Sequence, residues 1–304
     1  MSPDRLDVLV VGDANPDLVL RGDVHPRFGQ AEQLLTAADL VLGGSAGITA
    51  AGCARLGLRT GLLARIGDDV FGQFTRERLA ERGVVLAPLN SAELPTGLSV
   101  ILSTEEDRAI LTLPGTIPTL RREDVTDELL AGARHVHVSS LFLQPVLAAG
   151  LAEVFARARG LGVSTSLDTN WDPSEQWAGV TEILAHVDVF LPNAAELLAV
   201  TGRPVGQEEA AAADLVATGT TVVLKDGARG ARAWWPGGGC AAPGLPVDVV
   251  DTTGAGDSFN AGFLAGRLTG LPVAEAVALA ARAGSLSTRA AGGTSAQASV
   301  SDLR

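Results

Sequence analysis

Residues 251–259 read DTTGAGDSF, and the apolar segment NAGFLAGRL follows them directly. Gly254, Ala255 and Gly256 are small enough for the backbone to turn its N–H groups toward a bound anion. A helix that begins here adds the positive end of its dipole, which favours the charge of a phosphate group. Asp257 lies in the first turn of that helix, where a carboxylate can take a proton from a hydroxyl. The stretch predicts phosphoryl transfer to an alcohol, against the alternative of a glycine-rich turn with an acidic helix start.

Outside this stretch, apolar β-runs alternate with helical segments, starting with a strand at 6–11 and a helix at 45–56. Such alternation predicts an α/β fold with a mostly parallel sheet covered on both faces. A hairpin at 96–102 and 109–113 interrupts the alternation and indicates strands outside the main sheet. The other expected strands are 60–66, 135–138, 163–168, 187–191, 221–224, 230–235 and 247–250, and the other expected helices are 70–82, 146–159, 194–200, 208–217, 257–268 and 273–289.

Length and composition favour one large α/β domain over residues 1–304. The formal net charge of −12 argues against a nucleic-acid partner, because binding the phosphate backbone needs clustered Lys and Arg. The N-terminus lacks the basic start of a signal peptide, and the uncharged run at 40–54 is too short and glycine-rich for a membrane span. With the sparse cysteines Cys53 and Cys240, these features predict a cytoplasmic protein with no membrane partner.

Two N-terminal segments are candidate binding loops. Asn15 and Asp17 follow the first strand in the order G-D-x-N-x-D, a pattern that also suits a simple turn. Gly43 and Gly44 open the run GGSAGITAAGCARLG. Their missing side chains allow either close approach to a ligand or close helix packing.

Two later segments carry charge at the ends of predicted strands. Asn193 and Glu196 form N-A-A-E, which also fits a helix-capping pair. Lys225, Gly227 and Gly230 belong to the loop K-D-G-A-R-G. A lysine there can meet nucleotide phosphates as a point charge, or it can be an exposed turn residue.

Two other groups of polar residues carry less specific signals. Asp168, Asn170 and Asp172 lie beyond a strand, where acids would line the phosphate and metal side of a pocket. His135 and His137 share one face of a strand, but two residues without a third ligand make a weak metal site. We interpret these histidines as structural.

Together these segments resemble the ribokinase-like, or pfkB-type, carbohydrate kinase family. D-T-x-G-A-G-D is the family's specific C-terminal signature, GGSAGITAAG is similar to its N-terminal signature, and the likeness runs from Gly12 to Gly293. No Walker-type G-x-x-x-x-G-K-[ST] motif occurs in the chain. The resemblance implies a three-layer α/β/α sandwich with a small β lid formed by segments near 13–40 and 95–114. It also implies ATP-dependent phosphorylation of a sugar hydroxyl, with Asp257 as general base and the backbone of Gly254, Ala255 and Gly256 as the anion hole.

The resemblance also assigns ligands to individual positions. Magnesium is implied near Asn193 and Glu196, through water. A potassium ion is implied between the loop at Asp251 and Thr253 and the C-terminal loop at 288–294. The implied sugar contacts are Asn15, Asp17, Gly43, Gly44, Asp257 and the position of Ile48. The implied ATP contacts are Asn193, Lys225, Gly227, Gly230, Thr253, Gly254 and Gly256.

Ile48 departs from the family pattern, which has Asn at this place to contact the substrate. An apolar side chain cannot bind a hydroxyl, so ribose is expected to be a poor substrate. The remaining alternatives are a nucleoside kinase of the same fold and a non-catalytic sugar-binding protein. Some relatives pair their lids as homodimers, and residues 13–40 leave open whether this chain does.

Overall fold

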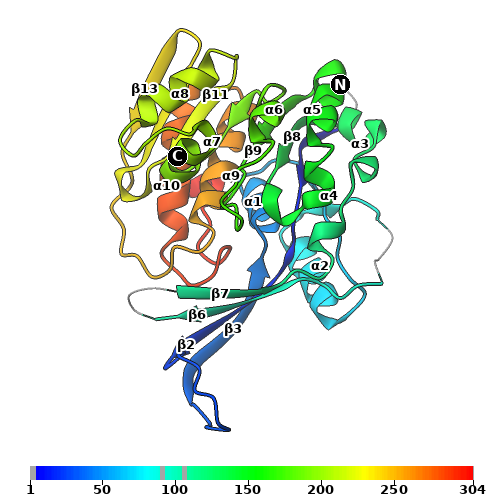
Figure 1. Ribbon diagram of the computed structural model, residues 1–304, viewed down its shortest axis with the longest axis vertical. Coiled ribbons are helices and arrows are strands. Elements are labelled where there is room, and N and C mark those ends of the chain that lie inside the picture. Colours follow the sequence, from blue (N-terminus) through cyan, green and yellow to red (C-terminus); the bar gives the residue numbers. More distant parts are fainter. Residues whose placement is uncertain (1–4, 90–92, 105–107, 304) are drawn as a thin grey trace.

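The computed structural model describes residues 5–89, 93–104 and 108–303 (Figure 1). A nine-stranded sheet forms the centre, with the order β13-β12-β11-β10-β9-β8-β1-β4-β5. All its strand pairs are parallel except β11–β12 and β12–β13 at one edge, which confirms the predicted mostly parallel sheet. Its strands are β1 (Leu6–Val11), β4 (Thr60–Leu63), β5 (Val85–Leu86), β8 (Ala133–Val138), β9 (Ser164–Leu167), β10 (Val189–Phe190), β11 (Thr221–Lys225), β12 (Ala231–Trp235) and β13 (Gly238–Ala242).

Successive side chains along the central strand β1 point alternately into two separate hydrophobic cores, one on each face of the sheet. Val8 and Val10 of β1 belong to one buried cluster, and Leu9 and Val11 belong to the other. The first cluster lies under α1 (Ser45–Arg55), α2 (Val70–Glu81), α9 (Ala255–Leu268) and α10 (Val273–Ser287). The second lies under α3 (Asp127–Ala131), α4 (Pro145–Ala148), α5 (Leu151–Gly160), α6 (Val180–Leu184), α7 (Ala194–Thr201) and α8 (Glu208–Val216). The predicted three-layer sandwich is therefore confirmed.

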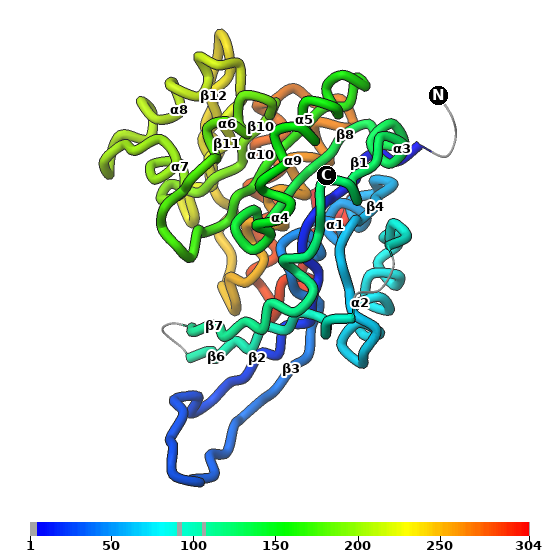
Figure 2. The backbone as a smooth tube through the Cα atoms, turned by 45° about the vertical axis from the view of Figure 1, so that its right-hand side comes forward, coloured from blue at the N-terminus to red at the C-terminus, as the bar shows by residue number. Residues whose placement is uncertain are grey.

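A four-stranded sheet extends from one end of this body as a lid (Figures 1 and 2). Its order is β3-β2-β6-β7, formed by β2 (Asn15–Gly22), β3 (Leu35–Gly43), β6 (Leu98–Ser103) and β7 (Arg108–Leu113). The predicted hairpin is confirmed, because β6 and β7 pair antiparallel. Only residues 12–14 separate β1 from β2, so the lid begins where the central strand ends.

Two element predictions are wrong. The expected strand at 247–250 is irregular, and β12 pairs instead with β13, because Gly237 at φ 85° closes a tight turn after Trp235. Gly238 fits at the start of β13 because it has no side chain; a Cβ atom there would clash with the Trp235 ring. The expected helix at 146–159 is split into α4 and α5, because Gly150 leaves the helical conformation at φ −120°.

The two strand histidines form a buried polar chain. His135 bonds Ser164 Oγ at 2.8 Å and Ser166 Oγ at 2.7 Å, and His137 bonds Ser166 Oγ at 2.7 Å and Ser139 Oγ at 2.9 Å. Burial lowers the pKa of His135 to about 3 and that of His137 to about 4. Among the described residues, no three His, Cys, Asp or Glu side chains group so as to hold a metal ion, and serine hydroxyls contact both ring nitrogens of each histidine, as the structural interpretation expects.

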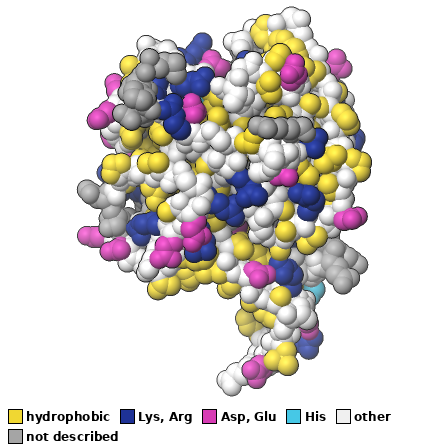
Figure 3. Space-filling view, turned by 180° about the vertical axis from the view of Figure 1, so that it is seen from behind, with side chains coloured by type: hydrophobic (Ala, Val, Ile, Leu, Met, Phe, Trp, Pro, Cys, Tyr) yellow, Lys and Arg dark blue, Asp and Glu magenta, His cyan; other side chains and the backbone are white. Residues whose placement is uncertain are grey.

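The surface seen in Figure 3 mixes acidic and basic side chains, with no continuous basic face in that view. Within the described ranges, none of the helices has both the length and the apolar character needed to cross a lipid bilayer.

Candidate active site

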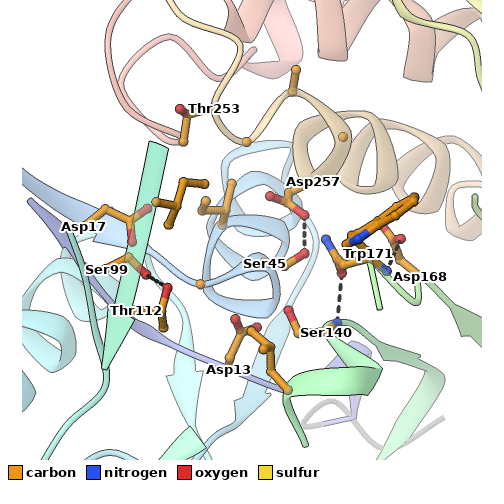
Figure 4. A pocket seen from close by; sticks show the side chains of 18 of the residues that line it. Asp13, Asp17, Ser45, Ser99, Thr112, Ser140, Asp168, Trp171, Thr253 and Asp257 are labelled. Carbon is orange, nitrogen blue, oxygen red and sulfur yellow. Dashed lines mark hydrogen bonds between the residues drawn. The ribbon is translucent and has the colours of Figure 1, made fainter. Parts of the chain in front are cut away.

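A cavity of about 810 Å³ lies between the lid and the C-terminal ends of the central strands. Figure 4 shows Asp257 and Ser45 facing each other across its centre. Asp17, Ser99 and Thr112 of the lid lie to one side of them, and Asp168 and Trp171 lie to the other. Segments that are far apart in the sequence therefore meet at the end of the sheet where α/β proteins bind ligands.

Asp257 lies in the first turn of α9, as predicted, and only 8% of the residue is exposed. Its Oδ1 accepts a hydrogen bond from the Ser45 hydroxyl at the start of α1. Burial, together with the negative charge of Asp168, raises the pKa of Asp257 to about 7. A carboxyl group with this pKa can exchange protons near neutral pH.

The backbone before Asp257 turns as the glycines predict. Gly254 adopts φ 70° and caps α9, and a side chain there would clash with Gly293 of the C-terminal loop. Backbone N–H groups in the first turn of a helix have no partner within the helix. The Ala255 N–H instead donates to Thr252 O at 3.2 Å, so Gly254 and Gly256 are the better placed of the three predicted donors.

The lid supplies the polar side chains predicted to meet a sugar. Asn15 Nδ2 donates to Asp17 Oδ1 at 3.1 Å, and both residues line the cavity. Burial, with the nearby charge of Asp13, raises the pKa of Asp17 to about 7. Gly44 also lines the cavity and is the N-cap of α1, at φ 75°. Gly43 does not line it; its missing side chain makes room for the Asp17 carboxylate.

Lys225 is the only lysine in the chain, and it lines the cavity at the end of β11. Its Nζ contacts Asp168 Oδ2 at 2.5 Å, and Asn260 Nδ2 donates to the same oxygen at 2.6 Å. A methyl group at Gly256 would lie 3.6 Å from Lys225 Nζ. The Lys225 side chain is 13% exposed, and its ammonium group is paired with a carboxylate and lies beside the N-terminus of α9.

Asn193 and Glu196 form the capping box at the start of α7 that their spacing predicts. Glu196 N donates to Asn193 Oδ1 at 2.9 Å, and Asn193 donates to both carboxylate oxygens of Glu196. Burial raises the pKa of Glu196 to about 7. Both residues line the cavity, and the carboxylate keeps lone pairs that can accept from a water molecule. These oxygens fit a hydrated magnesium ion, which prefers oxygen ligands and retains its water.

A second cavity of about 490 Å³ adjoins the first. Gly230 and the apolar residues Val247, Val249 and Phe259 line it. The two cavities share five residues at their junction, namely Lys225, Gly227, Thr252, Ala255 and Gly256. Three of the predicted ATP contacts, Lys225, Gly227 and Gly256, therefore lie at the junction. The others line one cavity each: Asn193, Thr253 and Gly254 the larger, and Gly230 the smaller.

Asp251 and Thr253, the predicted potassium ligands, lie together before the anion-hole turn. Asp251 Oδ1 accepts from Thr253 N at 2.8 Å and from Thr253 Oγ1 at 2.7 Å, and Oδ2 accepts from Gly292 N at 2.8 Å. Arg108 of the lid donates to Thr253 Oγ1 at 2.7 Å and lies 3.6 Å from Asp251. A cationic side chain already occupies this position, so these two side chains do not fit a monovalent cation.

Ile48 lines the cavity and is 3% exposed. Its side chain packs against Gly293 and against Gly254 at the anion-hole turn. It therefore contributes packing beneath that turn as well as an apolar patch beside the ligand space.

Ser45 and Arg108 are among the cavity residues that the sequence analysis missed. Ser45 reaches Asp257 from 212 positions away, and Arg108 reaches Thr253 from 145 positions away. Ser45 belongs to the quoted run GGSAGITAAG, but nothing in that run marks it as the partner of Asp257, and the sequence around Arg108 contains no motif. Lys225 does stand out in the sequence, because it is the single lysine among 23 Lys and Arg residues.

Residues 5–299 match the family model for the pfkB family carbohydrate kinase. The chain is 33% identical over 95% of its length to an ATP-dependent ribose-1-phosphate kinase of Halopiger xanaduensis, covering 94% of that protein. It is 31% identical over 98% of its length to a fructokinase of Klebsiella pneumoniae, covering 98% of that protein. An E. coli structure assigned as ribokinase II, in complex with ATP and Mg²⁺, has a TM-score of 0.83 at 22% identity, covering 98% of this chain and 97% of that one.

The chain therefore belongs to the pfkB family of carbohydrate kinases. It is a sugar kinase, an enzyme that transfers a phosphoryl group from ATP to a sugar. The assignment as a sugar kinase is therefore preferred to the alternative of a non-catalytic sugar-binding protein.

Proposed function

We propose that residues 1–304 act as one kinase domain that phosphorylates a hydroxyl of a neutral sugar, with Asp257 as general base. The observation that carries this proposal is the buried Asp257 carboxyl group at the N-terminus of α9, in the cavity that both the lid and the sheet line.

In the proposed reaction, Asp257 takes the proton of the acceptor hydroxyl as its oxygen attacks the γ-phosphorus of ATP, and ADP leaves. Backbone N–H groups of Gly254 and Gly256, with the helix dipole, stabilise the negative charge on the transferring group. Ala255 supports the turn, because its own N–H is engaged with Thr252 O. The lid excludes water, which would compete as the acceptor.

ATP is proposed to place its base in the 490 Å³ cavity beside Gly230 and its phosphates at the junction with the 810 Å³ cavity. The ammonium group of Lys225 lies at that junction and would face the phosphates. Asn193 and Glu196 would hold the hydrated magnesium, which neutralises phosphate charge. Potassium activation and a homodimer stay predictions, and the position of Arg108 beside Asp251 and Thr253 argues against potassium activation. A cytoplasmic location also stays a prediction, with which the two unpaired cysteines agree.

The charge of the sugar side favours an unphosphorylated acceptor. Asp13 and Asp17 both line this side, and burial, followed by the negative charge of Asp13, raises the pKa of Asp17 to about 7. A phosphate group on the acceptor would meet these carboxylates. We therefore expect a neutral sugar to be preferred over the ribose 1-phosphate used by the Halopiger xanaduensis relative.

A nucleoside is the second candidate acceptor, because an aromatic side chain lines the cavity. Trp171 is 48% exposed and is held edge-on against Trp177 at 5.2 Å between ring centroids. A free indole face can stack on a base.

The experiment is a coupled ADP-release assay with ATP, Mg²⁺ and a panel of ribose, fructose, 2-dehydro-3-deoxygluconate, ribose 1-phosphate and adenosine. A neutral sugar should give the highest kcat/KM. Highest turnover with adenosine would move the assignment to a nucleoside kinase, and highest turnover with ribose 1-phosphate would contradict the charge argument.

Asp257→Asn supplies the mechanistic test, because loss of a general base typically lowers the rate by about a hundred- to ten-thousand-fold. Asp17→Asn is the matched control, since it also removes a buried carboxylate from the cavity but should mainly raise the KM for the sugar. Near-normal turnover of folded Asp257→Asn would refute the role of Asp257.

A further inference from the structure

One row of lid side chains faces the cavity. Side chains on a strand alternate between its two faces, and Arg108, Ile110 and Thr112 of β7 all line the 810 Å³ space. Arg108 stands at the end of this row and reaches across to the body. Its Nη1 donates to Thr253 Oγ1 at 2.7 Å, directly before Gly254. A lid side chain thus contacts the turn that leads into the anion hole.

Asp251 joins three segments at the same place. Its Oδ1 holds the Thr253 turn, its Oδ2 accepts from the Gly292 N–H of the C-terminal loop, and Arg108 of the lid lies 3.6 Å away. Gly292 also packs against the lid, because a side chain there would contact Val41 of β3. The lid, the anion-hole turn and the C-terminal loop are therefore tied together through one carboxylate.

The positive charge beside the Asp251 carboxylate comes from a side chain of the protein, that of Arg108. The Asp251 side chain is only 17% exposed, and burying a carboxylate without a positive partner is unfavourable. Burial opposes ionisation here, but hydrogen bonds from Gly292 and Thr253 and the charge of Arg108 lower the pKa of Asp251. A guanidinium group stays protonated at any physiological pH, so its positive charge is permanent.

We propose that Arg108 is a positioning residue that sets the anion hole from the lid, and that its guanidinium group takes the place of a bound monovalent cation beside Asp251 and Thr253. This inference rests on the proposed role of the Gly254–Gly256 backbone. The anion-hole turn reaches its working geometry when the lid lies against the body, because only then does Arg108 reach Thr253. Potassium is consequently not required for turnover.

The test compares wild type, Arg108→Met and Arg108→Lys in potassium chloride and in tetramethylammonium chloride at equal ionic strength. Methionine keeps much of the length of the side chain without its charge. Arg21→Met is the matched control, because Arg21 is also a lid arginine but pairs with Asp39 inside the lid, at 2.8 Å. Turnover with the best acceptor of the panel and the thermal unfolding midpoint are measured for each protein.

Wild type and Arg21→Met should give the same rate and the same unfolding midpoint in both salts. Arg108→Met should lose about 10- to 100-fold in kcat, as expected when the stabilising groups are misplaced by about 1 Å. Added guanidinium ion or potassium should restore part of this loss, and Arg108→Lys should retain more activity than Arg108→Met. Potassium should raise the unfolding midpoint of Arg108→Met alone, by about 2 °C for a site that is well occupied.

Three outcomes would overturn the inference. These are full kcat in Arg108→Met, a loss in that variant that neither guanidinium ion nor potassium restores, and wild-type activation by potassium. The unfolding measurements need no turnover. If no acceptor is phosphorylated by wild type but the potassium response of Arg108→Met appears, the proposed function fails while the cation replacement stands.

Discussion

Replacing Ser45 with alanine tests the environment of the proposed general base. The Ser45 hydroxyl donates to Asp257 Oδ1, and both residues are buried. That hydrogen bond favours the ionised carboxylate and so opposes burial and the charge of Asp168, which raise the pKa of Asp257 to about 7. Ser45→Ala removes the donor without adding charge or bulk. The variant should therefore need a higher pH to ionise its base.

The size of the shift follows from the strength of the bond. A hydrogen bond to a charged group contributes about 1.5–3 kcal/mol, and one pKa unit corresponds to about 1.4 kcal/mol. The pKa of Asp257 should therefore rise by about one to two units. Half of the wild-type base is ionised at a pH equal to its pKa, about 7. At that pH, a shift of this size would leave about a tenth to a hundredth of the variant's Asp257 ionised. The kcat/KM of Ser45→Ala at about pH 7 should therefore be about five- to fiftyfold below that of wild type.

The assay is the pH dependence of kcat/KM for the acceptor, measured for wild type, Ser45→Ala and Ser45→Thr. The acid limb should move to higher pH in Ser45→Ala, and the rate should recover fully at high pH. Ser45→Thr keeps the hydroxyl and should retain the wild-type limb. An equal loss of rate at every pH, or an unmoved acid limb in a folded Ser45→Ala protein, would refute the reasoning.

Three more predictions concern other residues. Lys225→Ala should raise the KM for ATP more than the KM for the acceptor, and equal effects in steady-state kinetics would contradict a phosphate contact. Ile48→Asn should improve ribose relative to the native substrate, while a wild-type preference for ribose would refute this interpretation; unfolding should also show lost stability, because Ile48 packs against Gly293. His137→Gln should weaken the acid sensitivity of folding. A buried neutral histidine, with the pKa of His137 lowered to about 4, binds fewer protons than the unfolded chain, so its stabilising contribution is present above about pH 6.5 and is lost as the pH falls toward 4. Urea titrations should therefore show the free energy of unfolding falling less steeply in the variant, by about 1.4 kcal/mol per pH unit, and equal slopes would show that His137 is not buried in its neutral form.

Features that depend on neighbouring residues could be predicted from the sequence. The turn at Gly254 and the first helical turn that contains Asp257 lie within a few positions of each other, as do the capping partners Asn193 and Glu196. Their geometry follows from backbone conformation and short-range hydrogen bonds. The layered α/β class also followed, because the alternation of strands and helices dictates which faces must be covered.

Local pattern was insufficient where two conformations were both reasonable. The apolar run at 247–250 reads as a strand, but the turn at Gly237 gives β12 a nearer partner in β13. The helix expected at 146–159 breaks at Gly150, where a side chain would clash with Arg122. In both cases a glycine and its surroundings outweighed the intrinsic preference of the segment.

The sequence by itself determined the family, the layered fold and the local shape of the phosphate-binding turn, because each is written in residues that are close along the chain. Only the tertiary structure decided the partners of the charged groups. Ser45 meets Asp257, Lys225 meets Asp168, and Arg108 meets Thr253 across separations of 212, 57 and 145 residues. Such pairs form because folding removes these groups from water, and a buried charge must then find its partner wherever the packing of sheet, helices and lid brings one near.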